Sequence, residues 1–533
     1  MIGLELSPGH AQHWLLSADP LAAFFAAGEG QTVALAEGLN GGLSIWTEVG
    51  NNHAACLRLD NDNPGTRYSW RETLLAELRN IYPVGALSLT GSWSQLQSSG
   101  SGLAGSYTGN RAVSTGSLTA TAAVTVDRAE PYDLWVHFTG RTSGGYLKVQ
   151  IDGAQALVNE IDDPANLGFK AFSTYAPLDL TRRQSVKVAS GLIGSHAVTL
   201  AFGGAATPGG AAIMIEGVAI SGALSDPRIL PPLWATGTTY EMGDEVRVGG
   251  IFYSARANGV SGSTAPSHVS GIASDGVLDW RADNRPTYPD FIAIDYASER
   301  EYAAQFDVSG VITEVGGQTH GNEPLVSRTI LLDGVPWVPE TSGLGLSVGN
   351  SIAMVETTTW QTQLGDPVGT CQLTRTVLPG SLRHDVIVTG TGPALAFDWL
   401  YAGMVPMVRW DGESATTVMD TVTAADGTTE TLADSAGIAP PNVDFAGAQR
   451  LAISGAAKGT GFSYGHEAGA LVAAGSVIGP FTAFLRPNLE ARSESGSLDW
   501  TAKAYVAAAP DVGASFGAGD TLAFYSRHVI AVP

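Results

Sequence analysis

The stretch GDEVRVGGIFYSARANG at residues 243–259 decides how this chain folds. Polar and apolar side chains alternate on both sides of the paired Gly249 and Gly250, a pattern typical of two strands joined by a tight turn. A helix would require apolar residues spaced three and four positions apart. The stretch therefore predicts a β-hairpin, and similar alternation recurs through much of the 533-residue sequence.

The composition favours a chain built mainly of β-structure. Hydrophobic residues make up 44% and charged residues 15%, while 66 Gly and 27 Pro favour turn-rich strands over helices. The net charge of −23 would repel a phosphate backbone, which argues against nucleic acid as a partner. Cys56 and Cys371 are the only cysteines, so we expect no disulfide framework, no cysteine-based metal site and no cofactor.

Two further features bear on where the protein is made. The first Lys or Arg is Arg58, and the early apolar stretch PLAAFFAAG lacks the basic flank of a secretory signal. The uncharged segment between Glu467 and Arg486 has 18 residues, and glycines and a proline interrupt it. We therefore expect synthesis in a bacterial cytoplasm and no membrane insertion.

Residues 1–83 carry the clear helix signals of this sequence. SADPLAAFFAAG, at residues 17–28, has an Asp-Pro start and a closing glycine. SWRETLLAELR, at residues 69–79, has a capping-box pattern at Ser69 and Glu72 followed by leucines on one helical face. We predict two short helices and interpret residues 1–83 as an attachment segment, packed on its own strands or docked on another subunit.

Residues 84–224 are predicted to form an antiparallel β-sandwich, because short alternating strands follow a Gly/Ser-rich start. GGYLKVQIDG, at residues 144–153, ends in Asp-Gly, and GSHAVTLAFGG, at residues 194–204, opens with Gly-x-His. This pair resembles the jelly-roll carbohydrate-binding modules. The resemblance implies a sugar site on loops, with Tyr146 and Tyr175 as candidate rings.

Residues 225–285 begin with the Pro-rich linker SDPRILPPLW and continue into the hairpin. The spacing W-x5-Y-x2-GD-x-V-x3-G-x2-Y-x-A, with a later Pro and Trp, resembles the small chitin-binding-type modules found in secreted glycosidases and in phage tail fibres. The residues that carry this resemblance are Trp234, Tyr240, Gly243, Asp244, Val246, Gly250, Tyr253, Ala255, Pro266 and Trp280.

The same resemblance implies that four rings of this module could face a sugar: Trp234, Tyr240, Tyr253 and Trp280. The alternative is that a module this small needs its large rings for its own core, above all the two tryptophans. Arg256 and Ala257 stand where the chitin binders expose aromatic residues. This difference argues against chitin itself and leaves a structural spacer as the alternative.

Residues 286–533 are predicted to form one large distal β-sandwich, because so many strands must stack to hide their edges. Its repeated long strands and the turn GGQTHGNEP resemble sandwiches of the sugar-mutarotase type. HGNE places His320 and Glu323 on one turn, and GHE places His466 beside Glu467. If these turns met, they would form an acid–base or metal cluster; otherwise they are solvated loop residues.

The series of modules resembles phage or phage-like spike and tail-fibre receptor-binding proteins, including those of gene-transfer agents. The resemblance implies non-catalytic attachment to a bacterial cell-surface polysaccharide from the virion surface, with other virion proteins bound through residues 1–83. We expect a homo-oligomer, either a trimer or a pentamer at a capsid vertex, because several weak sugar sites multiply affinity. A glycan depolymerase or deacetylase and a purely structural virion protein are the two alternatives.

Overall fold

The computed structural model describes most of the chain between residues 32 and 531. The described ranges are 32–38, 41–50, 52–61, 64–97, 111–156, 171–177, 181–224, 231–240, 244–283, 291–295, 302–316, 323–342, 345–408, 417–431, 441–457, 460–470, 478–491, 498–510 and 514–531. Within these ranges the chain is almost entirely antiparallel strand, with a short 3₁₀ turn, η2, at Val84–Ala86. This confirms the predicted mainly β, multidomain class. None of these ranges contains a helix long and apolar enough to cross a bilayer.

The chain forms two compact units, and one interrupts the other along the sequence. Unit 1 comprises Met1–Ala76, Ile292–Pro339 and Ser347–Pro533, and unit 2 comprises Glu77–Phe291 and Glu340–Leu346. The predicted boundaries at residues 84, 225 and 286 therefore differ from the observed division. The predicted sandwich and hairpin module both belong to unit 2.

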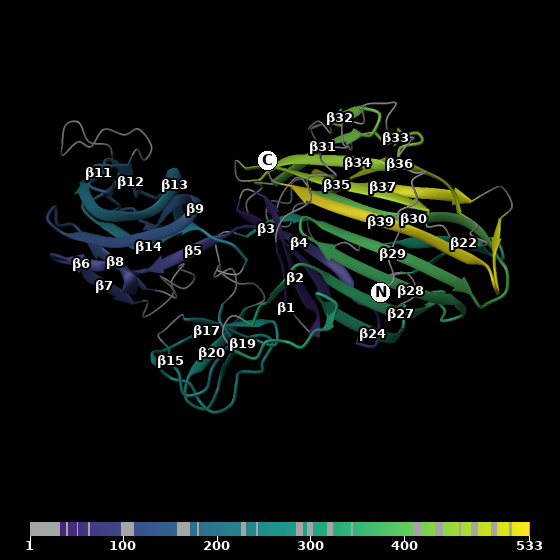
Figure 1. Cartoon of the computed structure of the whole chain (residues 1–533), viewed down its shortest axis with the longest axis horizontal. Coiled ribbons are helices and arrows are strands. Elements are labelled where there is room, and N and C mark those ends of the chain that lie inside the picture. Colours follow the sequence, from purple (N-terminus) through teal and green to yellow (C-terminus); the bar gives the residue numbers. More distant parts are fainter. Residues whose placement is uncertain are drawn as a thin grey trace. The chain divides into compact units, whose positions relative to one another are not determined.

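The largest sheet of unit 1, here called the wide sheet, contains ten of the described strands (Figure 1). Their order is β25 (Val335–Pro336), β24 (Leu325–Leu332), β27 (Ile352–Gln361), β28 (Pro367–Leu378), β29 (Ser381–Gly390), β39 (Thr521–Ala531), β35 (Thr460–Ala470), β34 (Arg450–Ala457), β31 (Thr417–Ala424) and β32 (Thr429–Thr431). Burial alternates residue by residue along β27, so one face of this sheet is directed towards a core.

Two smaller sheets complete unit 1 within the described residues. The seven-stranded sheet runs β23 (Val311–Val315), β22 (Ala303–Val308), β30 (Leu395–Val408), β37 (Leu498–Pro510), β36 (Ile478–Ala491) and β33 (Val443–Phe445), with β38 (Ser515–Phe516) on β30. The six-stranded sheet runs β21 (Phe291–Asp295), β4 (Ser69–Glu77), β3 (His53–Asp60), β2 (Leu43–Gly50), β1 (Val33–Glu37) and β26 (Ser347–Gly349).

One continuous hydrophobic core joins all three sheets of unit 1. Leu57 of the six-stranded sheet, Leu373 of the wide sheet and Val506 of the seven-stranded sheet are buried in the same cluster. Burial of the inner faces of the three sheets stabilises unit 1. The outer faces can therefore carry side chains that are not needed for the core. The predicted large sandwich is thus observed, and it also includes strands from the start of the chain.

The helix predicted from the capping-box pattern at Ser69 and Glu72 is wrong. These residues lie in β4, and β5 (Arg79–Pro83) follows. Trp70, Thr73 and Leu75 are all fully buried. A surface helix needs a polar face, whereas this segment is enclosed by neighbouring strands, so tertiary pairing overrode a local helix signal.

The described part of residues 1–83 does not form a domain of its own, and its role in attachment stays a prediction. Strands β1 to β4 form most of the six-stranded sheet and contribute Val33, Ile45 and Trp70 to the core of unit 1. The helix predicted at residues 17–28 lies outside the described residues. The N-terminal strands are therefore structural partners of the C-terminal half.

The sandwich of unit 2 contains ten described strands that curve around one core (Figure 1). The order is β11 (Ala154–Gln155), β10 (Tyr146–Ile151), β13 (Thr181–Gly204), β9 (Thr121–Gly140), β14 (Ile213–Ser221), β8 (Arg111–Thr115) and β7 (Ser94–Gln97), with β12 (Phe172–Ser173) on β10, β5 on β14 and β6 (Ser88–Thr90) on β9. The long strands β9 and β13 pair with several register shifts, and bulges of this kind allow strands to bend.

The predicted hairpin is confirmed. β16 (Glu245–Val248) pairs with β17 (Ile251–Ala255), and the turn residues Gly249 and Gly250 have φ of 52° and 79°. Two positive φ angles define the turn that suits a two-residue hairpin, which explains the paired glycines. The sheet continues through β20 (Asp279–Asp283) and β19 (Gly271–Ser274), and β15 (Thr239–Tyr240) pairs separately with β18 (Gly259–Val260).

Candidate functional site

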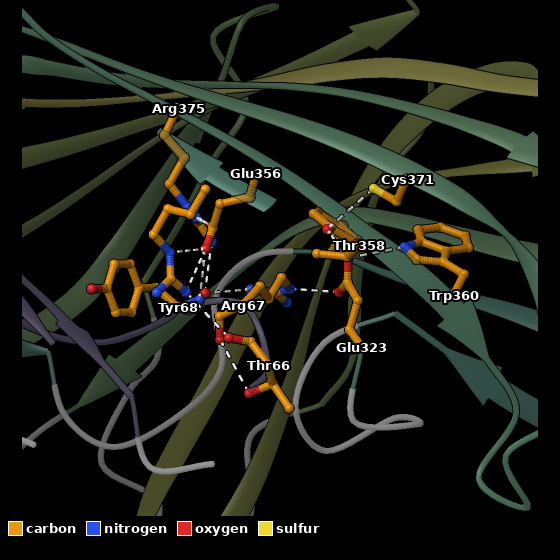
Figure 2. A network of polar contacts seen from close by, with 11 residues as sticks. Thr66, Arg67, Tyr68, Glu323, Glu356, Thr358, Trp360, Cys371 and Arg375 are labelled. Atoms are coloured by element: carbon orange, nitrogen blue, oxygen red, sulfur yellow. Dashed lines mark hydrogen bonds and ion pairs between the residues drawn. The ribbon is translucent and has the colours of Figure 1, made fainter. Parts of the chain in front are cut away.

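Glu323, one of the predicted acid–base residues, lies in a buried polar network of unit 1 (Figure 2). Its Oε1 accepts hydrogen bonds from the Tyr302 hydroxyl at 2.7 Å, the Thr358 hydroxyl at 2.7 Å and the Trp360 indole at 3.2 Å. Its Oε2 accepts from Arg67 Nε at 2.5 Å. Both carboxylate oxygens are therefore occupied by groups that hold the charge in place.

A second buried carboxylate, Glu356, lies beside this group (Figure 2). It accepts from Arg328 Nε at 2.7 Å and from the Tyr68 backbone N–H at 3.1 Å, and it forms an ion pair with Arg375. Arg375 also donates to the Tyr68 carbonyl at 2.7 Å. The network thus connects the segment before β4 to β24, β27 and β28.

These contacts give the network a structural role. Removing one partner from a buried ion pair typically costs about 3–5 kcal/mol, because the remaining charge is left without compensation. Burial also raises the pKa of Tyr302 and of the Cys371 thiol well above their ordinary values, so both stay protonated. The interpretation of Glu323 as part of an acid–base or metal cluster is wrong, because its oxygens are already engaged.

The other members of that predicted cluster are His320, His466 and Glu467. His320 lies outside the described residues. His466 and Glu467 lie in β35, opposite His528 and Arg527 of β39, and their side chains are also outside the described part. Among the described residues, no group of three or more His, Cys, Asp or Glu side chains could hold a metal ion.

The Asp-Gly motif and the Gly-x-His motif of the unit 2 sandwich lie in contact. Asp152 Oδ1 accepts from the Ala197 backbone N–H at 2.8 Å, and Asp152 Oδ2 lies 2.6 Å from His196 Nδ1. The first of these hydrogen bonds, followed by the contact with His196, lowers the pKa of Asp152. The Asp-Gly turn between β10 and β11 is therefore held against Ala197 and His196 of the neighbouring strand β13.

The candidate sugar rings of this sandwich lie in neighbouring segments. Tyr146 begins β10, is half-buried and pairs with Ser173, two residues before Tyr175. Tyr175 is 37% exposed and forms a bridge with Arg141. A sugar site at these tyrosines stays a prediction.

Three of the four candidate rings of the hairpin module are core residues. Tyr240, Tyr253 and Trp280 are at most 7% exposed, and the rings of Tyr240 and Trp280 pack edge to face at 5.1 Å. The Trp280 indole donates to Asp275 Oδ2 at 2.9 Å. Because their faces are covered, the interpretation of these three as sugar-facing is wrong. Trp234 is half-buried against the same core, and its role in sugar binding stays a prediction.

The seven-stranded sheet of unit 1 carries a depression of about 450 Å³ in its described part, a volume within the usual range of small-ligand sites. It is lined mainly by aromatic and charged side chains, and we call it the aromatic depression. The residues used below are Trp399 and Tyr401 of β30, Asp444 of β33, Phe484 and Arg486 of β36, and Tyr505 of β37.

Strand alternation places these rings on the face opposite the core. On β30, Leu400 and Ala402 are fully buried, whereas Trp399 and Tyr401 point the other way and are half-buried. Tyr505 lies between Val506 and Ala504, which both face the core. Neighbouring strands then bring the rings together, since Tyr505 is directly opposite Phe484.

The rings form a layered cluster. Phe484 and Tyr505 stack with centroids 5.0 Å apart, and the guanidinium carbon of Arg486 lies 4.2 Å from the centroid of the Phe484 ring. Phe484 is therefore only 7% exposed and supports its neighbours. Tyr401 lies 5.4 Å from Tyr505 and 6.3 Å from Trp399. The partly exposed Trp399, Tyr401 and Tyr505 present the surface that a ligand can reach.

Polar groups surround the rings. Arg486 pairs with Asp444 at 2.8 Å, and the Asp444 side chain is 70% exposed. Burial, and then the nearby Tyr401, raises the pKa of Tyr505 to about 12. Burial, and then Glu314, raises the pKa of Tyr401. Both phenols therefore stay neutral at physiological pH and can donate as well as accept hydrogen bonds.

The aromatic depression was not predicted from the sequence. The segment FDWLYAG predicts a strand. Its alternation places Trp399 and Tyr401 on the same face, where an ordinary outer strand carries polar residues, and this pair of rings was a signal for a binding site. Phe484 and Tyr505 come from distant strands that only the folded sheet brings beside them.

Comparisons with known proteins give no family. No family model and no curated protein matches the chain. Solved structures with local likeness include the catalytic unit of a GH87 α-1,3-glucanase from Streptomyces thermodiastaticus, at 14% identity over 30% of this chain and 31% of that one, TM-score 0.18. The GH36 α-galactosidase AgaA from Geobacillus stearothermophilus has 12% identity over 54% and 40%, TM-score 0.25.

A third structure is a cycloisomaltooligosaccharide glucanotransferase from Paenibacillus sp., at 11% identity over 84% of this chain and 45% of that one, TM-score 0.20. All three names describe proteins that act on carbohydrates. The chain spans less than half of each of these proteins. Likeness at these scores carries no argument about this chain, so its function is inferred from its own residues.

Proposed function

We propose that this protein is a non-catalytic carbohydrate-binding protein and that the aromatic depression is its glycan site. The observation that carries the proposal is the combination of half-buried Trp399, Tyr401 and Tyr505 with the Asp444–Arg486 pair at their edge. A pyranose has an apolar face of C–H groups and an edge of hydroxyl groups. Aromatic faces complement the first, and phenols and carboxylates complement the second.

The rim favours binding over cleavage. Hydrolysis of a glycosidic bond usually requires two carboxyl groups, one of them protonated, about 5–10 Å apart. In the depression, Asp444 is the lining carboxylate, and it is held by Arg486 in an ion pair at 2.8 Å. Asp444 is therefore suited to accept hydrogen bonds from sugar hydroxyls.

We further propose that this binding serves attachment of a phage or phage-like particle, as a spike or tail fibre on the virion surface, to a bacterial cell-surface polysaccharide. The support is the resemblance of the hairpin module to tail-fibre modules, together with the series of β-units. A trimer or a capsid-vertex pentamer would place several depressions on one particle and multiply weak affinities. Immunogold labelling of purified particles tests this setting, because a spike must be labelled on the outside.

Replacing Trp399 with alanine tests the glycan site. We expect Trp399→Ala to weaken binding of purified protein to host-cell polysaccharide at least tenfold, since large buried rings dominate contact energies. Leu364→Ala is the matched control, because Leu364 is 91% exposed in the same unit and remote in sequence from the depression. Tyr175→Ala reports on the alternative site in unit 2.

Three results would contradict the proposal. Unchanged binding by Trp399→Ala would exclude the depression, and loss of binding in Tyr175→Ala alone would move the site to unit 2. Release of reducing ends or acetate from the polysaccharide by the unmodified protein would make it an enzyme. Circular dichroism of each variant confirms that the fold is kept.

A further inference from the structure

We infer that the aromatic depression selects neutral and amino sugars and rejects acidic sugars such as uronic acids, and that the Asp444–Arg486 pair sets this preference. The inference rests on the proposed glycan site. It follows from which charged groups line the depression and which of their atoms are already engaged.

Arg486 is the cation that lines the described part of the depression, and its Nη1 and Nη2 atoms both contact the protein itself. Its Nη2 pairs with Asp444 at 2.8 Å, and its Nη1 donates to the Leu485 carbonyl at 2.8 Å and, more weakly, to the Val443 carbonyl at 3.4 Å. Its flat face covers the Phe484 ring. A sugar carboxylate would have to compete with Asp444 for this guanidinium.

Two further carboxylates, Glu314 and Asp398, lie near Tyr401 but outside the residues that line the depression. Glu314 accepts a hydrogen bond from Gln305 at 3.0 Å, and Gln305 pairs with Trp399 across β22 and β30. Both Glu314 and Asp398 act on Tyr401, where their charges disfavour the phenolate. An incoming carboxylate would therefore meet like charges, whereas a hydroxyl or an ammonium group would meet acceptors.

Lys503 is a further cation on these strands and lies opposite Arg486 in the β36–β37 pairing. It is not among the residues that line the depression. The net charge of −23 adds a general repulsion of polyanions, although salt screens it beyond about 8 Å at physiological ionic strength. The local arrangement of Asp444 and Arg486 thus determines the preference between neutral and acidic sugars.

Asp444→Asn should invert the preference. The substitution removes one negative charge and releases the Arg486 guanidinium, whose planar fork matches a carboxylate. Asp444 is 70% exposed, so the fold should tolerate the change. Asp366→Asn is the matched control, because it removes one exposed carboxylate of the same unit outside the depression.

The experiment uses an array on which each uronate-containing oligosaccharide is printed beside its carboxyl-reduced form, with neutral and amino-sugar chains included. We expect the unmodified protein to bind neutral, amino and carboxyl-reduced chains at least tenfold better than acidic ones. Asp444→Asn should narrow that ratio at least tenfold or reverse it, while Asp366→Asn should leave it unchanged.

The outcomes separate this inference from the proposed function. If the unmodified protein prefers acidic chains and Trp399→Ala abolishes that binding, the depression is a glycan site and the inference is wrong. An unchanged ratio in Asp444→Asn also overturns the inference. If the unmodified protein binds no printed chain, or if Trp399→Ala binds as well as the unmodified protein, the proposed site itself fails and the inference with it.

Discussion

In the hairpin module of unit 2, Tyr240, Tyr253 and Trp280 turn inward, whereas on the seven-stranded sheet of unit 1, Trp399 and Tyr401 lie on the face away from the core. The same residue types thus form the core in one region and line an outer face in the other. A small module has few aliphatic residues to bury, so its large rings must form its core. The unit 1 sandwich has an extensive aliphatic core and can place rings on an outer face.

Alanine substitution of one aromatic residue in each region tests this difference in burial most directly. We expect Trp280→Ala to lower the free energy of unfolding of the hairpin module by about 3–5 kcal/mol, because it empties a fully buried site. Trp399→Ala should cost unit 1 less than about 1 kcal/mol, because Trp399 is half-buried on the outer face. Hydrogen exchange read by mass spectrometry locates each loss, and similar losses in both regions would contradict the comparison.

Acid should loosen the hairpin module through Asp275. Burial raises the pKa of Asp275, but hydrogen bonds from the Leu278, Gly262 and Val277 backbones and from the Trp280 indole outweigh it, so the pKa is lowered overall. This stability is present above the ordinary carboxyl pKa of about 3.9 and is lost as the pH falls through the lower folded-state value.

Thermal unfolding between pH 7 and pH 2 measures this effect. Asp275→Asn should be less stable than the unmodified module at pH 7 by about 1–3 kcal/mol, and the gap should close in acid. A gap that stays constant with pH would show that the charge of Asp275 is not what the module uses.

The smallest expected effect concerns the phenols of the depression. An ordinary tyrosine is half ionised near pH 10, whereas the pKa of Tyr505 is raised to about 12 and that of Tyr401 is also raised. Glycan affinity should therefore change less than about twofold between pH 7 and pH 10. Ultraviolet titration of Tyr505→Phe against the unmodified protein identifies the late-ionising group, and ionisation of Tyr505 near pH 10 would contradict its burial.

The sequence predicted the hairpin well because its signals are local. Alternation and the glycine pair at Gly249 and Gly250 report backbone geometry within a few residues. The same kind of reasoning was wrong at Ser69, where a capping pattern is equally local but strand neighbours enclose the segment. It was also wrong at Glu323, because a sequence does not show which groups will surround a carboxylate.

By itself, the sequence determined that this protein is an antiparallel β-protein with a glycine-turned hairpin and few charges. The tertiary structure alone decided that the N-terminal strands complete the C-terminal sandwich, that Tyr253 and Trp280 are core, and that Trp399, Phe484 and Tyr505 meet. The physical reason is that turn geometry and alternation depend on neighbours along the chain, whereas burial and convergence depend on pairing between distant strands.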